Sequence, residues 1–184
     1  IVVSVKTAGI LALEGGFDME GGLDVLRLFH RLGVRKVQFT SHDTTNAFAD
    51  AGLGDQAWGG ITDHGRAVIQ EMNRLGILID VSHASDAAQL AIIEASAAPV
   101  VASHHGLRQF SNHTRTLSDA VLTAMAAKGG LIGIHSQADY LSQESLDWVI
   151  SRTRSSAPEV DWLQDLIRSP SRDYGQYIAT LDTE

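Results

Sequence analysis

Short apolar runs alternate along this chain with longer segments whose apolar positions recur at helical spacing. The runs cover residues 9–16, 34–42, 77–83, 100–106 and 131–136. Most of them are continuous and rich in β-branched residues, a pattern typical of strands that are buried on both faces. Such strands are usually parallel and have helices outside them, so the pattern predicts a parallel α/β sheet.

The segments between these runs predict helices with recognisable ends. Helices are expected over residues 22–32, 63–75, 87–96 and 120–130. Thr62 has the position of an N-cap for the second helix, and Gly76 that of a terminating glycine. Ser118 has the position of an N-cap for the fourth helix. The regular alternation of strand and helix indicates a βα architecture.

Polar side chains stand at the carboxyl end of each predicted strand. They are Glu14, His42, His83, His104 and His135. If the strands curl into a barrel, these groups converge at one mouth, where barrel enzymes have their active sites. In a doubly wound open sheet, the alternative, they would lie in a row. We therefore predict a (β/α)8 TIM barrel with outer helices, and a partial one, because a complete barrel needs about 250 residues.

The last part of the chain differs from the rest. We expect residues 1–140 to form the partial barrel and its metal site. Residues 141–184 place Trp148, Trp162 and Leu166 at helical spacing. This segment is therefore expected to be a helical insertion or tail that packs on the outside of the barrel or over its mouth.

The composition argues against several classes of protein. The 184 residues carry a formal net charge of −8, which disfavours a nucleic-acid partner. The chain has no cysteine, so any metal must be held by His, Asp or Glu. No apolar run approaches the roughly 18 residues of a membrane span. Because a partial barrel leaves strand edges open, a homo-oligomer is one expected outcome.

The strand-end residues are those that hydrolytic zinc sites use as ligands. A glutamate can bridge two cations, since each of its oxygens offers a ligand. A single strand-end histidine is more often structural, so the evidence is the repetition of the pattern. Glu14 could also cap a helix, but a carboxylate at a buried strand end needs a cation or donors to offset its desolvation. His135 is less well supported as a ligand, because no serine precedes it, whereas a serine precedes each of the other strand-end histidines.

Several stretches resemble the membrane (renal) dipeptidase family in their residues, their order and their spacing. They are ALEGG (12–16), VRKVQFTSHDTTNAFAD (34–50), GITDHGRAVIQEMNRLGILIDVSH (60–83), PVVASHHG (99–106) and HTRTLSDAVL (113–122). The resemblance covers roughly residues 9 to 136. It implies an α/β barrel, a pair of zinc ions in the intact enzyme, and the hydrolysis of dipeptides as small substrates.

The same resemblance implies a role for individual residues. Glu14 matches the carboxylate that bridges both metals, and His83 and His104 match the imidazoles that hold one of them. His42 matches the histidine beside the substrate carbonyl, where it would stabilise the developing oxyanion. Arg115 matches the arginine that contacts the substrate carboxylate, a task that suits a guanidinium fork. Asp80 is expected to be a hydrogen-bond acceptor rather than a ligand.

Two parts of the family pattern are absent from this sequence. No His-x-Asp pair occurs, although the family uses one for the second metal, and the late Gly-x-Asp-Phe-Asp-Gly stretch is missing as well. We therefore expect the chain to be an internal piece of a longer enzyme, lacking the first and last barrel strands and weakly active or inactive.

Two other classes of function stay open at this stage. One is a related barrel amidohydrolase that acts on a cyclic amide or a phosphoester. The other is a barrel homologue without catalytic activity.

Overall fold

The computed structural model describes residues 9–19, 22–41, 44–53 and 56–155. All of its named strand pairs are parallel. The strands are β1 (Leu11–Glu14), β2 (Val34–Gln38), β3 (Leu78–Asp80), β4 (Val101–Leu107), β5 (Thr116–Leu117) and β6 (Leu131–Ile134). The helices are α1 (Leu23–Arg31), α2 (Asp63–Leu75), α3 (Asp86–Ala95), α4 (Asp119–Lys128), α5 (Ala138–Leu141) and α6 (Gln143–Ser155), with a 3₁₀ turn, η1, at Phe17–Met19.

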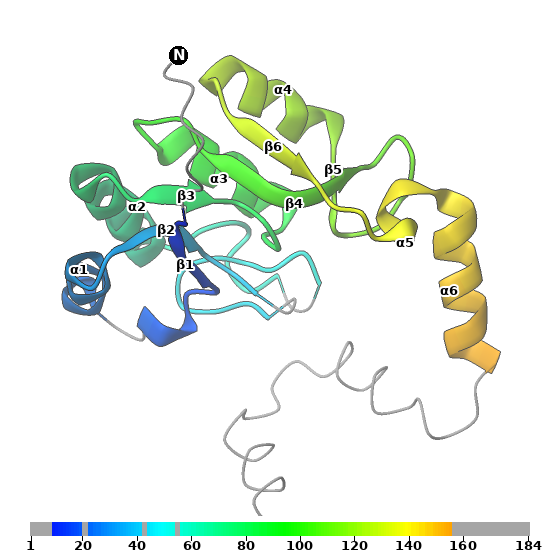
Figure 1. Ribbon diagram of the computed structural model, residues 1–184, viewed down its shortest axis with the longest axis horizontal. Coiled ribbons are helices and arrows are strands. Elements are labelled where there is room, and N and C mark those ends of the chain that lie inside the picture. Colours follow the sequence, from blue (N-terminus) through cyan, green and yellow to red (C-terminus); the bar gives the residue numbers. More distant parts are fainter. Residues whose placement is uncertain (1–8, 20–21, 42–43, 54–55, 156–184) are drawn as a thin grey trace, which may run out of the picture.

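The strands lie in the sheet in the order in which the chain forms them. β1 pairs with β2, β2 with β3, and β3 with β4, and β4 then pairs with both β5 and β6. Helices α1 to α4 follow the same order, each packed against the next (Figure 1). A doubly wound sheet would reverse its strand order at a switch point. The observed order is instead that of consecutive βα units in a barrel wall.

The helix ends follow from local chemistry. The Thr62 hydroxyl accepts a hydrogen bond from the Gly65 amide at 3.0 Å, and Gly76 ends α2 with a left-handed φ of 69°. The Ser85 hydroxyl caps α3 by accepting from the Ala88 amide at 3.1 Å. Ser118 has the N-cap position of α4, as predicted, but its side chain makes no capping hydrogen bond.

Most strands end earlier than the predicted runs, whereas β4 matches its run of residues 100–106 to within one residue. β1 ends at Glu14 and β2 at Gln38, short of the predicted ends at residues 16 and 42. β3 stops at Asp80, so His83 lies beyond the strand in a turn. β4 continues past His104 to Leu107, because its last residues pair with β5 (Gly106 with Thr116). The two Ser-His pairs, which look alike in the sequence, therefore occupy different backbone environments.

The two faces of the sheet have different chemistry. Side chains alternate between the faces along each strand. Val37, Ile79 and Ala102 point to one face and join the apolar core with residues of the helices, among them Leu26, Ile69, Met72, Ile92, Val121 and Met125. Lys36, Asp80 and Ser103, each one position away, meet on the other face. The helix-covered face is thus apolar, and the opposite face carries a polar cluster.

The segment after β6 is described only as far as Ser155. α5 packs on β4, where the backbone of Gly106 approaches the carbonyl of Tyr140 so closely that a Cβ at Gly106 would clash. α6 leads away from the sheet (Figure 1). Trp148, on this helix, is exposed. The proposed boundary between residues 140 and 141 falls inside α5, and the division into 1–140 and 141–184 stays a prediction.

An ion-pair cluster joins α1 to α2 and gives the fold a testable dependence on pH. The Glu71 carboxylate accepts hydrogen bonds at 2.7 Å from Arg74 on its own helix and from Arg27 on α1. These bonds, from Arg74 first and Arg27 second, lower the pKa of Glu71 to about 2. A carboxyl whose pKa is lower in the folded state stabilises the fold above its unfolded pKa. This stabilisation is lost as the pH falls from about 4.5 towards about 2.

We therefore expect Glu71→Gln to lower the thermal unfolding midpoint at pH 7. The difference from the wild type should shrink as the pH falls below about 4.5, because the wild-type carboxyl then becomes protonated. Thermal unfolding followed by circular dichroism between pH 3 and pH 7 measures both effects. Glu94→Gln, at an exposed position of α3, is the matched control. A Glu71→Gln deficit that stays constant over this pH range would contradict the expectation.

Candidate metal centre

Three of the predicted ligands meet at one point in the structure. Glu14 comes from the end of β1, His83 from the turn after β3, and His104 from β4. His83 Nε2 lies 3.1 Å from His104 Nε2 and 3.2 Å from Glu14 Oε1, and His104 Nε2 lies 3.6 Å from the same oxygen. Among the described residues, these are the ones that form a group of donor atoms able to hold a metal ion.

The spacing of the three atoms fits a small divalent cation. Tetrahedral zinc with ligands at 2.0–2.1 Å requires neighbouring donor atoms about 3.3 Å apart. The observed separations of 3.1, 3.2 and 3.6 Å bracket that value. Two imidazole nitrogens and one carboxylate oxygen are also a donor set that zinc accepts. The residues present therefore fit the metal that the family resemblance implies.

His83 has an unusual backbone conformation. Its φ of 68° lies in the left-handed region, which costs a residue other than glycine roughly 1–3 kcal/mol. The surrounding structure holds this conformation: the Gly52 amide donates to the His83 carbonyl at 2.7 Å, and the side chain is buried. Strain retained at a candidate ligand is typical of a functional position.

Glu14 lies at the exposed edge of the sheet, contrary to the expectation of a buried carboxylate. Its side chain is 57% exposed, because β1 is an edge strand in the described part of the sheet. The chain then turns at Gly15, which has φ 102°, and at Gly16, whose backbone lies against the Phe39 carbonyl. A Cβ at either glycine would clash, so this pair allows the turn that leaves Glu14 facing the two histidines.

His104 is held in a form suited to binding a metal. Burial lowers its pKa first, and the nearby charge of Arg115 and the ring of His83 lower it further. Neutral imidazole is the form that binds metals. The other ring nitrogen, Nδ1, lies 2.8 Å from the hydroxyl of Ser103.

Arg115 lies beside His104. Its guanidinium Nη2 donates to the His104 carbonyl at 3.2 Å, and its Cζ lies 5.6 Å from the centre of the Tyr140 ring. Only 5% of Arg115 is exposed. The structure thus brings this predicted substrate-binding residue to the side of a candidate ligand.

The remaining histidines have different places. His42, predicted to be catalytic and to bind substrate, lies outside the described residues. The His135 ring centre is 6.0 Å from that of His104, and His135 is not in the group of donor atoms described above. His105 is fully buried, and burial lowers its pKa to about 3.

The structure adds residues to which the sequence analysis gave no role. Lys36 and Ser103 contact the buried carboxylate of Asp80, which was expected to be an acceptor. The sequence could have indicated Lys36, because a lysine in a strand with both faces buried requires an anionic partner. The indication for Ser103 is weaker: Ser103 and His104 repeat the Ser-His pair of residues 82 and 83.

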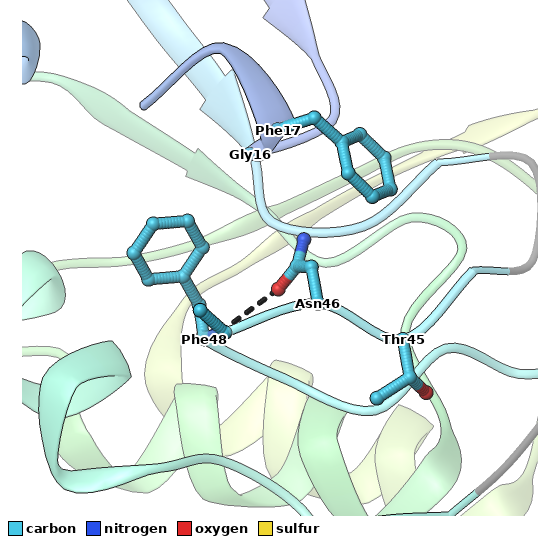
Figure 2. Close-up of a pocket in the computed structure, with 6 residues that line it drawn as sticks. Gly16, Phe17, Thr45, Asn46 and Phe48 are labelled. Atoms are coloured by element: carbon cyan, nitrogen blue, oxygen red, sulfur yellow. Dashed lines mark hydrogen bonds between the residues drawn. The ribbon is translucent and has the colours of Figure 1, made fainter. Parts of the chain in front are cut away.

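Two hollows lie around the strand ends. The smaller, about 250 Å³, is lined by the turn after Glu14 and the loop of residues 45–48, with Asn46 between Phe17 and Phe48 (Figure 2). Asn46 fastens this loop, accepting from the Phe48 amide at 2.9 Å and donating to the Phe39 carbonyl at 2.6 Å. The larger, about 740 Å³, is lined in part by Gly52, which bonds to His83, and by Thr114, which precedes Arg115.

Comparison with known proteins identifies the chain's relatives. The family model described as membrane dipeptidase (peptidase family M19) matches residues 3–180. Dipeptidase aclJ of Aspergillus oryzae is 32% identical over 143 residues, which are 77% of this chain and 34% of that protein. The chain thus spans about a third of the length of the curated relative. Within the described residues, no helix is long and apolar enough to cross a membrane.

Solved structures agree with this assignment. The probable dipeptidase PvdM from Pseudomonas aeruginosa matches with a TM-score of 0.71 and 28% identity, over 79% of this chain and 39% of that one. A Rhodobacter sphaeroides metallo peptidase, liganded with a phosphinate mimic of the dipeptide L-Ala-D-Ala, matches with a TM-score of 0.67 and 27% identity, over 78% and 46%. The predicted partial α/β barrel is confirmed, and the chain belongs to the membrane dipeptidase family, peptidase family M19.

Proposed function

We propose that the protein takes part in the zinc-dependent hydrolysis of dipeptides, with Glu14, His83 and His104 as metal ligands. The observation that carries the proposal is the convergence of three donor atoms, 3.1–3.6 Å apart, from three separate segments of the chain. Family membership independently implies a metal. Zinc in such a site lowers the pKa of a water molecule and polarises a carbonyl oxygen.

We propose that Glu14 is a ligand shared between two ions. One of its oxygens, Oε1, faces both histidines, and the side chain as a whole is 57% exposed. The second oxygen can therefore accept a further cation, as a bridging carboxylate does in a site with two metals. We accordingly propose two zinc ions for the complete enzyme, one of them held by these three residues.

Arg115 is the proposed anchor for the substrate carboxylate. A guanidinium binds a carboxylate through two parallel hydrogen bonds, which fixes both its position and its orientation. Because Arg115 donates to the backbone carbonyl of His104, a carboxylate bound by its guanidinium would lie in the neighbourhood of the three donor atoms. We propose that this contact limits the substrate to a dipeptide, the class that the bound ligand of the Rhodobacter relative imitates.

His42 is proposed to stabilise the oxyanion that develops on the scissile carbonyl. This role is supported by the position of His42 in the stretch VRKVQFTSHDTTNAFAD, which resembles the family.

The net charge of −8 is consistent with a small substrate rather than a nucleic acid. A homo-oligomer stays a prediction, because the exposed apolar residues of the edge strands, Leu11 on β1 and Leu131 on β6, lie where the partial barrel is open.

Zinc binding tests the metal site directly. We expect the chain to bind zinc, and His83→Ala or His104→Ala to weaken the affinity by more than about 100-fold, the upper end for the loss of a residue that only supports a ligand. Competition with a chromophoric chelator measures the affinity. His30→Ala, on α1, is the control and should leave the affinity unchanged. Equal affinity in the wild type and both ligand variants would refute the site.

Arg115 should determine whether the substrate needs a terminal carboxylate. We expect the complete gene product to hydrolyse Gly-Leu faster than Gly-Leu amide. Arg115→Ala should lower kcat/KM for Gly-Leu by about 10- to 100-fold, the loss of one charge-assisted hydrogen-bond pair, with little effect on the amide. Arg35→Ala, at an exposed position of β2, is the control. A variant that retains the wild-type preference for Gly-Leu over its amide would exclude this role for Arg115.

A further inference from the structure

A buried carboxylate, that of Asp80, joins three strands close to the three candidate metal ligands. Asp80 at the end of β3 is fully buried. It accepts hydrogen bonds from Lys36 Nζ on β2 at 2.7 Å, from the Ser103 amide on β4 at 3.1 Å, and from the Ser82 amide at 3.0 Å. The Ser103 hydroxyl also contacts it. These contacts lie on the sheet face opposite the apolar core. The oxygen of the Ser103 hydroxyl also lies 2.8 Å from Nδ1 of His104.

The protons in this network can be placed by counting donors and acceptors. A lysine ammonium only donates, and an ionised carboxylate only accepts. Burial opposes ionisation of Asp80, but the hydrogen bonds from Lys36 and Ser103 outweigh it and hold the pKa of Asp80 below its ordinary value. The single hydroxyl proton of Ser103 therefore points to Asp80. The oxygen of Ser103 is left to accept from Lys36 Nζ, at 3.2 Å, and from His104 Nδ1, at 2.8 Å.

This assignment determines the tautomer of His104. If Ser103 accepts at Nδ1, that nitrogen carries the ring proton. The neutral ring then has its lone pair on Nε2, the atom 3.1 Å from His83 Nε2 and 3.6 Å from Glu14 Oε1. With the opposite tautomer, Nε2 would direct a proton into the cluster and would be unable to bind a cation.

We propose that Asp80, Ser103 and Lys36 form a relay that keeps the Nδ1–H tautomer of His104 and so presents Nε2 to the metal. The three are positioning residues, since none of them faces the cluster itself. A carboxylate that contacts a ligand histidine directly is a common arrangement in metal sites. Here a serine hydroxyl stands between the two, and Lys36 neutralises the buried carboxylate. The role of the relay rests on the proposed metal function, but its effect on the tautomer does not require a metal.

The tautomer is measured by two-dimensional ¹H–¹⁵N NMR of the ring nitrogens of the metal-free chain, with His104 assigned by its loss in His104→Ala. We expect the wild type to show His104 mainly as the Nδ1–H form. Ser103→Ala should lose this preference, and Ser103→Thr, which restores the hydroxyl, should recover it. Ser96→Ala is the matched control, because Ser96 is a buried serine whose hydroxyl donates to the Ala98 carbonyl at 2.8 Å rather than to a residue of the relay. It should leave the tautomer unchanged.

Zinc affinity provides the second readout. Ser103→Ala should weaken zinc binding by about 10- to 100-fold, as the loss of a residue that orients a ligand does elsewhere. Ser103→Thr should bind zinc nearly as tightly as the wild type. A merely structural serine would alter the unfolding midpoint without changing the tautomer or the affinity.

The possible failures are distinguishable. If the wild type shows the Nε2–H form, or if Ser103→Ala keeps both the Nδ1–H form and the wild-type zinc affinity, the relay is refuted while the zinc site stands. If the wild type binds no zinc, the proposed function fails, and the NMR result still decides whether the relay sets the tautomer. Should Ser103→Ala fail to fold, the wild-type tautomer and the threonine variant decide the question.

Discussion

The hydrogen bonds to the buried carboxylate of Asp80 are the interactions that hold the site's strands in place. This carboxylate accepts hydrogen bonds from three neighbouring parts of the sheet, namely Lys36 on β2, the amide of Ser82 after β3, and Ser103 on β4. A buried ion is costly unless its partners compensate for the lost hydration, so these groups must hold their relative positions. The two histidines that follow the serines, His83 and His104, are thereby carried to the same place.

The division of the sheet into two faces makes such a cluster possible. On the helix-covered side, Val37, Ile79 and Ala102 contribute to the core and supply the apolar burial that stabilises the fold. On the other side, the neighbouring positions hold Lys36, Asp80 and Ser103. A shift of register by one residue would exchange the two sets, placing charges in the core. The apolar contacts of the helices therefore also preserve the geometry of the polar face.

The three donor atoms are held to different degrees. His104 belongs to a strand and is tied to Ser103, whereas His83 lies in a strained turn that the Gly52 amide helps to hold. Glu14 is more exposed, at the edge strand β1. A carboxylate with this exposure is accessible to a second cation, in agreement with the bridging role that we propose for it. The site thus combines one buried imidazole, one partly buried imidazole and one exposed carboxylate.

Much of this architecture was predictable from the order of residues. Continuous apolar runs, helix caps such as Thr62, and glycines such as Gly76 are local signals, because they reflect what a few neighbouring residues can do. The recurrence of polar residues after apolar runs likewise indicated Glu14, His83 and His104, but it equally indicated His135, which is not in the group of donor atoms, and His42, which lies outside the described residues. Local pattern could not place His83 in a left-handed turn, since the contacts that hold this turn come from distant segments such as Gly52. The Lys36–Asp80–Ser103 contacts, which join residues 23 to 67 positions apart, exist only once the strands are side by side.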